Sequence, residues 1–185
     1  IRLRFQGTAS STTAGINITF DAITAAAALN GEKWSTSCFF RFNAITGLPA
    51  GNMLLELWNY TSASAFIGTG SASAEGTLNT AVSSTLSRLD TRRTFADATT
   101  AYARTVLRSG NISSGTVCDY EFVIGLPQLE AGGFTTSPIQ TTGSAATRAG
   151  DVITLRDVSF LNQAAASVYM KYTPLFSYDE LGSSS

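Results

Sequence analysis

The chain has 185 residues and a mass of 19.4 kDa, which suits a single domain whose core needs neither disulfides nor a metal. Its net charge of −1 excludes the basic surface that nucleic-acid binding requires, and no apolar run is long enough to span a bilayer. The absence of histidine excludes Ser-His-Asp and Cys-His catalysis. Because Ile1 is not an initiator residue, we expect a fragment or a processed chain.

Short β-prone runs, divided by Gly, Ser, Asn and Pro, follow one another along the sequence. They predict strands at 2–6, 15–20, 33–43, 52–60, 77–83, 87–95, 101–109, 116–125 and 152–156. The only helix candidate is 21–30, for which an extended connection is the alternative, and the stretch 61–76 is expected to be a loop or a weak edge strand. This pattern predicts an all-β fold, either an antiparallel sandwich or a barrel.

Two of the predicted strands, 33–42 and 117–124, alternate clearly between two faces, whereas the run 53–60 is ambiguous. In 33–42, one face holds Trp34, Thr36, Cys38, Phe40 and Phe42. In 117–124, the apolar face holds Cys118, Tyr120, Phe122 and Ile124. In 53–60, the residues expected inward are Met53, Leu55 and Leu57, and in 101–108 one face presents Tyr102, Arg104, Val106 and Arg108. One apolar and one mostly polar face are typical of strands in a two-layer sandwich.

The two cysteines, Cys38 and Cys118, lie far apart in the sequence without a CxxC pair, which excludes a thiolate zinc site. A disulfide between them is one interpretation. Both residues lie in apolar, strand-like runs, however, where free thiols commonly pack in a core. We therefore expect both cysteines to be buried and reduced.

The segment 125–151 (GLPQLEAGGFTTSPIQTTGSAATRAGD) holds PQLE at 127–130, a glycine pair at 132–133, TSPI at 136–139, TG at 142–143 and TRAGD at 147–151. It resembles a signature of bacteriophage tail-fibre and minor tail proteins, where it closes a jelly-roll domain of the carbohydrate-binding-module type. Gly150 stands where Ala or another small residue is usual in that family. The runs at 31–42 and 116–130 are similar to an early and a late strand of that domain. The resemblance implies a two-sheet antiparallel jelly-roll sandwich over about 1–157.

The resemblance also implies a role. It indicates a non-catalytic module of a phage tail or fibre protein, made in the bacterial cytoplasm and carried in the virion. Its expected partners are host cell-surface polysaccharide and other virion tail proteins, and a homotrimer is compatible with it. A purely structural module, which docks or oligomerises without binding sugar, stays open as the alternative. Residues 158–185 are expected to be a C-terminal extension, either the start of a following domain or a strand of this fold or of a neighbouring protomer.

The chemistry of the signature is that of turns rather than of a ligand site. Pro127 is predicted to end the hydrogen-bonded ladder of its strand, and Gly132 with Gly133 to allow positive φ in a crossing between the sheets. Arg148 is expected either to pair with Asp151 or to donate to buried carbonyl groups of the crossing.

Sugar binding requires aromatic rings for stacking together with carboxylates and arginines that fork onto hydroxyl groups. The faces turned away from the core offer Trp58, Tyr60, Glu56, Arg41, Tyr102, Arg104, Arg108, Asp119 and Glu121. If their strands are neighbours, they form one concave polar–aromatic sheet, which is the usual ligand surface of jelly-roll modules. The alternative is that Trp58 and Tyr60 pack under a loop while the charges form a solvated face or ion pairs. Trp34, on an inward face, is expected in the core.

We expect no enzyme, and in particular we disfavour a polysaccharide depolymerase. Glu56 and Glu121 could form a carboxylate pair for glycoside hydrolysis, but no pattern of a deep pocket accompanies them. No cofactor is expected. Calcium is the metal that related sugar-binding jelly rolls often hold as a structural ion, and the sequence places no ligands for it.

Overall fold

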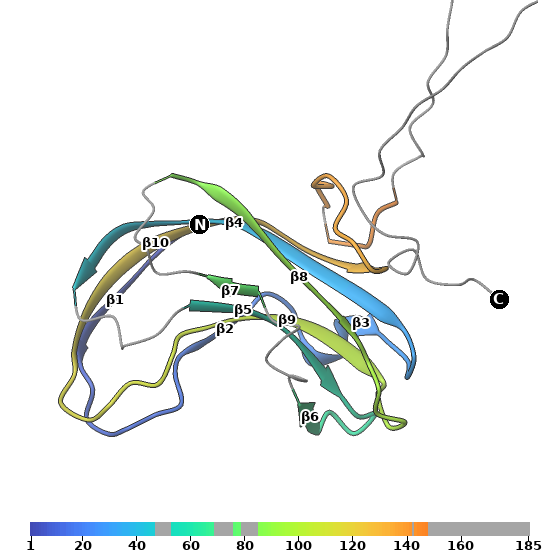
Figure 1. Ribbon diagram of the computed structural model, residues 1–185, viewed down its shortest axis with the longest axis horizontal. Helices are drawn as coiled ribbons and strands as arrows, with labels where there is room; N and C mark the ends of the chain where they lie inside the picture. Colours follow the sequence, from blue (N-terminus) through green and yellow to red (C-terminus); the bar gives the residue numbers. More distant parts are fainter. Residues whose placement is uncertain (47–52, 69–75, 79–84, 142, 148–185) are drawn as a thin grey trace, which may run out of the picture.

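The computed structural model of the chain describes residues 1–46, 53–68, 76–78, 85–141 and 143–147. They form two antiparallel β-sheets that pack face to face as an arched sandwich (Figure 1). This arrangement confirms the prediction of an all-β, two-sheet fold. Within these ranges, no helix is long and apolar enough to cross a membrane.

The first sheet has four strands in the order β1, β10, β4 and β8. The strands comprise Arg2–Thr8 (β1), Val117–Ala131 (β10), Lys33–Thr46 (β4) and Ser87–Thr94 (β8). The two central strands are also the longest, with 15 residues in β10 and 14 in β4. Their apolar faces therefore contribute most of this sheet's share of the core.

The second sheet has six strands, four of which follow the order β2, β9, β5 and β6. They comprise Asn17–Thr19 (β2), Tyr102–Arg108 (β9), Met53–Tyr60 (β5) and Phe66–Gly68 (β6). β3 (Ala26–Ala27) adds to β9, and β7 (Gly76–Leu78) adds to β5. Because the chain passes repeatedly from one sheet to the other, the strand order is that of a jelly roll.

Two segments for which the sequence leaves two alternatives open contain short β-strands in the structure. Within 21–30, a single 3-10 turn, Ile23–Ala25, leads into β3, so this region is a connection and not an α-helix. Within 61–76, the described residues include β6, which pairs with β5 at the edge of the sheet. A weak edge strand was one of the two predictions for that segment.

The inward faces predicted from the alternation are confirmed. The buried residues of β4 and β10 include all nine that were predicted inward: Trp34, Thr36, Cys38, Phe40, Phe42, Cys118, Tyr120, Phe122 and Ile124. On β5 and β9, the inward residues Leu55, Leu57, Ala103 and Leu107 are at most 1% exposed. These side chains form two apolar clusters, a larger one around Phe122 and a smaller one that contains Trp34.

A polar contact joins the two sheets where the clusters meet. Thr36 of β4 and Thr105 of β9 are buried, and their hydroxyl oxygens lie 2.7 Å apart. The Thr36 hydroxyl also donates to the backbone oxygen of Gln128, 2.8 Å away. Because Thr36 has a single hydroxyl hydrogen, Thr105 is the donor in the contact between the sheets.

The prediction that Pro127 ends the ladder of its strand is wrong. β10 continues to Ala131, and its pairing with β4 shifts register between Gly125 and Gln128. Leu126, inside this irregularity, has a φ of 44°. The bulge removes Pro127, which has no N–H group to donate, from the ladder and lets the pairing resume beyond it.

The signature segment is held against the outer face of the four-stranded sheet by its own side chains. Thr136 N donates to Glu130 Oε2 at 2.9 Å, and Ile139 N donates to Gln128 Oε1 at 3.1 Å. Gly132 turns the chain with a φ of 137°, in the region that favours glycine. The PQLE and TSPI pieces therefore bind one another, which supports a structural interpretation of the signature.

The two cysteines are free and buried, as predicted. Phe39, next to Cys38, pairs with Gly125, which lies seven positions (125 − 118) beyond Cys118 on β10. At about 3.3 Å per residue, the two thiols are on the order of 20 Å apart along the strands, well beyond disulfide range.

Several predictions concern residues outside the described ranges. They are the strand at 152–156, most of the strand at 77–83, the pairing of Arg148 with Asp151, and the extension 158–185.

Candidate functional site

Six of the candidate binding residues share the outer face of the six-stranded sheet, on the hollow side of the arch in Figure 1. β5 and β9 are neighbours, and the alternation of side chains places on this face Glu56, Trp58, Tyr60, Tyr102, Arg104 and Arg108. Trp58 lies directly opposite Arg104, and Tyr60 lies directly opposite Tyr102. We call this surface the β5/β9 face.

Arg41 does not belong to the β5/β9 face, although the sequence analysis grouped it there. It lies on β4, opposite Val123 of β10, in the four-stranded sheet. The outer faces of a sandwich point away from each other, so Arg41 and Trp58 cannot contact the same sugar ring. Periodicity predicts that Arg41 points outward, but not which sheet its strand joins.

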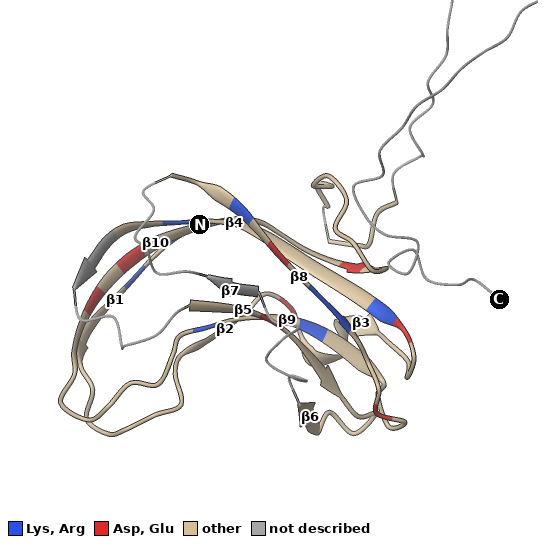
Figure 2. Ribbon diagram, viewed as in Figure 1, with Lys and Arg blue, Asp and Glu red and all other residues tan. Residues whose placement is uncertain are grey.

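Asp119 and Glu121 also lie on the four-stranded sheet, where β10 runs beside β1 (Figure 2). Arg4 Nε donates to Asp119 Oδ1 at 2.9 Å, and Arg2 Nη2 donates to Glu121 Oε2 at 2.7 Å. These hydrogen bonds lower the pKa of each carboxyl group below its ordinary value. The two acids form the ion pairs of an ordinary surface, as the alternative interpretation held.

Glu56 is the polar centre of the β5/β9 face. Its side chain is fully buried and accepts hydrogen bonds from Arg108 Nε at 2.9 Å and from Trp58 Nε1 at 2.5 Å. The Arg108 Nη2 atom completes a forked ion pair at 2.5 Å. One carboxylate therefore fixes both the arginine and the indole, so the orientation of Trp58 is set before any ligand arrives.

The aromatic side chains of this face differ in their solvent exposure. Trp58 is half-buried and packs against Phe66, with ring centroids 4.7 Å apart and an interplanar angle of 54°. Tyr60 is only 5% exposed, and its ring also meets Phe66, at 5.8 Å. Tyr60 is thus covered, whereas Trp58 borders open space.

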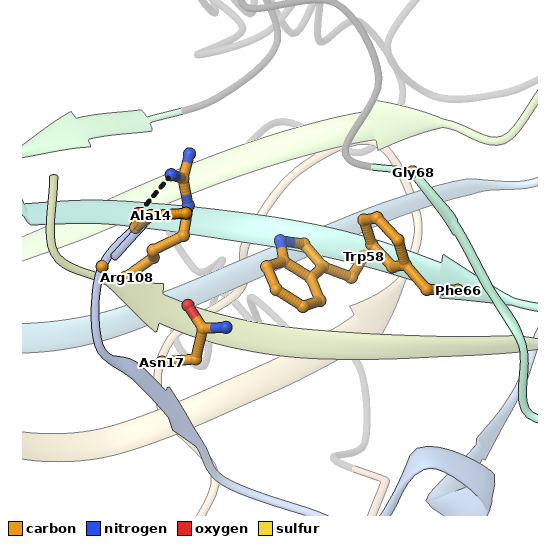
Figure 3. Close-up of a pocket in the computed structure, with 7 residues that line it drawn as sticks. Ala14, Asn17, Trp58, Phe66, Gly68 and Arg108 are labelled. Atoms are coloured by element: carbon orange, nitrogen blue, oxygen red, sulfur yellow. Dashed lines mark hydrogen bonds between the residues drawn. The ribbon is translucent and has the colours of Figure 1, made fainter. Parts of the chain in front are cut away.

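That open space is a hollow of about 510 Å³ beside the indole (Figure 3). Its lining consists of Ala14, Gly15, Asn17, Trp58, Phe66, Gly68 and Arg108. In Figure 3, Arg108 and Asn17 lie on one side of Trp58, and Phe66 lies on the other. An aromatic ring, an amide and a guanidinium group thus border one hollow, which is the combination that sugar recognition uses.

Phe66 and Asn17 were missed as site residues by the sequence analysis. Phe66 belongs to the Ser/Ala-rich segment that was expected to be a loop or weak edge strand, and it is 52% exposed. A large aromatic residue among small ones was the signal that could have found it. Asn17 is on the short edge strand β2, opposite Arg108, and nothing in its local sequence indicates this pairing.

Arg104 and Tyr102 complete the face along β9. Both are half-buried, and Arg104 forms no hydrogen bond or ion pair with the described part of the chain. Its Nε atom is buried without an acceptor. Arg104 therefore differs from Arg108, whose charge is matched by Glu56.

The described strands of this sheet do not bring two carboxylates together on the β5/β9 face. Glu56 is the only carboxylate on the described strands of this sheet, whereas glycoside hydrolysis uses two. Glu121, its suggested partner, lies on the other sheet. Among the residues that the structure describes, no group of three or more Cys, Asp or Glu side chains could hold a metal ion.

Comparisons with protein-family models and with curated proteins give no match. One similar solved structure is the tripod (BppUct-A-L) from the baseplate of bacteriophage Tuc2009, with 13% sequence identity and a TM-score of 0.44. The similar region covers 75% of this chain and 48% of that chain, so this chain spans about half the length of its structural neighbour.

Proposed function

We propose that the chain is a non-catalytic module of a phage tail or fibre protein, and that it binds host-surface glycans on the β5/β9 face. The observation that carries the proposal is Trp58. Its indole borders the hollow on the concave side of the sheet, and its Nε1 atom is tied to the buried Glu56. A rigid aromatic platform loses little conformational freedom when a sugar ring stacks on it.

The polar groups around the platform support this function. Asn17 offers an amide, and the guanidinium group of Arg108 borders the same hollow. The hollow is lined by both apolar and polar groups, as expected where a pyranose presents C–H patches and hydroxyls together.

The assignment to a phage tail rests on the signature at 125–151. In the structure, the PQLE and TSPI pieces have an architectural role, because the side chains of Gln128 and Glu130 hold the segment around Thr136 by hydrogen bonds. A signature with a structural role marks the domain type and leaves the ligand surface free to vary. We accordingly propose other virion tail proteins as partners as well.

The test is a glycan array followed by affinity measurements on Trp58→Ala. Losing an aromatic platform should weaken binding by about 1–3 kcal/mol. Because Trp58 is half-buried, its removal should cost less stability than the roughly 3–5 kcal/mol typical of a fully buried Trp. Phe39→Ala is the matched control, since it removes a half-buried aromatic ring from the outer face of the other sheet.

Two results would contradict the proposal. If Trp58→Ala folds and its glycan affinity is unchanged, the β5/β9 face is not the binding site. An array without any bound glycan would favour the structural virion module, which docks or oligomerises without sugar.

A further inference from the structure

Arg104 holds a positive charge that nothing in the described structure neutralises. Its Nε atom is buried without a hydrogen-bond acceptor, and no carboxylate pairs with the guanidinium group. A partly desolvated charge of this kind is costly unless an anion compensates it. The residue stands in the middle of β9, directly opposite Trp58, so it is part of the same surface as the indole.

The remaining charges of the β5/β9 face are already balanced. Glu56 is occupied by Arg108 and by Trp58 Nε1, so it has no capacity left for a second arginine. The described strands of this sheet carry two arginines and one carboxylate, which leaves a net charge of +1 at Arg104. The hollow side of the sandwich therefore favours an anionic ligand.

We propose that Arg104 binds the carboxylate or phosphate group of an anionic glycan while a ring of the same glycan stacks on Trp58. This inference rests on the proposed function and specifies its ligand class. Directly opposite residues of an antiparallel pair have Cβ atoms about 4.5–5.5 Å apart, so both side chains can reach one or two adjacent sugar units.

The geometry of a guanidinium group suits this ligand. With Nε covered, the two terminal nitrogens are left to take two oxygens of a carboxylate or phosphate end-on. The same charge would repel cationic ligands and would gain little from neutral sugars. Neutral and anionic glycans should thus be distinguished at this residue.

The test is an array that pairs each uronate-containing or phosphate-containing glycan with a neutral counterpart, such as polygalacturonate with its carboxyl-reduced form. We expect the wild-type protein to prefer anionic members by at least tenfold and to lose that preference as NaCl rises from about 0.05 to about 0.5 M. Whether uronates or phosphates are bound identifies the source of the anion.

Two variants assign the preference to Arg104. Arg104→Gln should lose at least tenfold in affinity for anionic glycans and keep a melting temperature at or above that of the wild type, because no partner is lost. Arg104→Lys keeps the charge and should lose less. Arg41→Gln, the same charge change on the other sheet, should leave binding unchanged.

The outcomes separate this inference from the proposed function. Binding confined to neutral glycans, or anionic binding that survives in both Arg104 variants, overturns the role of Arg104 and leaves glycan binding intact. An array with no binding overturns both. A fall in the melting temperature of Arg104→Gln without loss of anionic binding would show that Arg104 is structural.

Discussion

Replacing Glu56 with Gln should destabilise the fold more than the small change in shape suggests. The carboxylate is fully buried and accepts hydrogen bonds from Arg108 and from the indole of Trp58. Gln keeps the volume and one acceptor oxygen, but it exchanges the negative charge for an NH2 group that faces other donors. The substitution removes the negative charge of the ion pair and one of the two oxygens that accept hydrogen bonds from Arg108.

The expected magnitude follows from how much water reaches the pair. Neutralising one member of a fully buried ion pair costs about 3–5 kcal/mol, because the other charge is left without compensation. The Arg108 side chain is 25% exposed and keeps part of its hydration, which reduces our expectation to about 2–3 kcal/mol. At about 2–4 °C for each kcal/mol, the melting temperature should fall by about 4–12 °C.

Glu32 provides a matched control elsewhere in the chain. Its Oε2 atom accepts a hydrogen bond from Nε1 of Trp34, also two residues later in the sequence, at 3.0 Å. No arginine pairs with Glu32 in the described structure. Glu32→Gln therefore makes the same chemical change beside an indole without breaking an ion pair, and should cost about 1 kcal/mol.

The assay is urea and thermal unfolding followed by circular dichroism, with a double-mutant cycle over Glu56→Gln and Arg108→Gln. We expect a coupling energy that accounts for most of the loss in the single Glu56 variant. Equal losses in Glu56→Gln and Glu32→Gln, or a coupling energy near zero, would refute the role given to the ion pair.

Three further predictions concern other parts of the fold. Burial raises the pKa of the Cys38 thiol to about 12, so native protein at pH 8 should resist thiol reagents, whereas denatured protein should show two thiols, Cys38 and Cys118; two rapidly reacting thiols in native protein would contradict this. Because the arginines of β1 lower the pKa of Asp119 and Glu121, their stabilisation is present at neutral pH and is lost as acid protonates both groups. Melting temperatures measured from pH 7 to pH 3 should fall less when both arginines are replaced by Gln, and parallel curves would argue against these pairs. Gly15→Ala should lower the melting temperature and weaken glycan binding, since the φ of Gly15 is +126° and the new Cβ would lie 2.2 Å from a backbone oxygen. A variant with the same melting temperature as the wild type would rule out this strain.

The sequence predicts those features of the fold that depend on local alternation. The inward residues of β4, β5, β9 and β10 are where the period of two places them, because successive side chains of a strand must point to opposite faces. The same rule put Trp58 and Arg104 on outward faces. That they lie opposite each other on one surface follows only once β5 and β9 are known to be neighbours.

The errors concern pairings between distant segments. Arg41 was grouped with Trp58 because both point outward, and the topology places their strands in different sheets. Pro127 was expected to stop its strand, but a bulge with Leu126 at positive φ carries the strand past it. Phe66 reaches the site through the pairing of β6 with β5; a weak edge strand was one prediction for that segment, but its local sequence does not indicate the partner strand.

The hydroxyl contact between Thr36 and Thr105 has a consequence for how the two layers find their alignment. Leu, Phe and Met side chains would tolerate many relative positions of the sheets, since apolar packing is not directional. A slip of two residues would bring an apolar side chain against each threonine. Thr36 would keep its hydrogen bond to Gln128 within its own sheet, whereas the buried Thr105 hydroxyl would lose its acceptor, at a cost of about 1–3 kcal/mol. The contact between the two threonines therefore favours one alignment of the sheets and raises the free energy of compact but misaligned sandwiches.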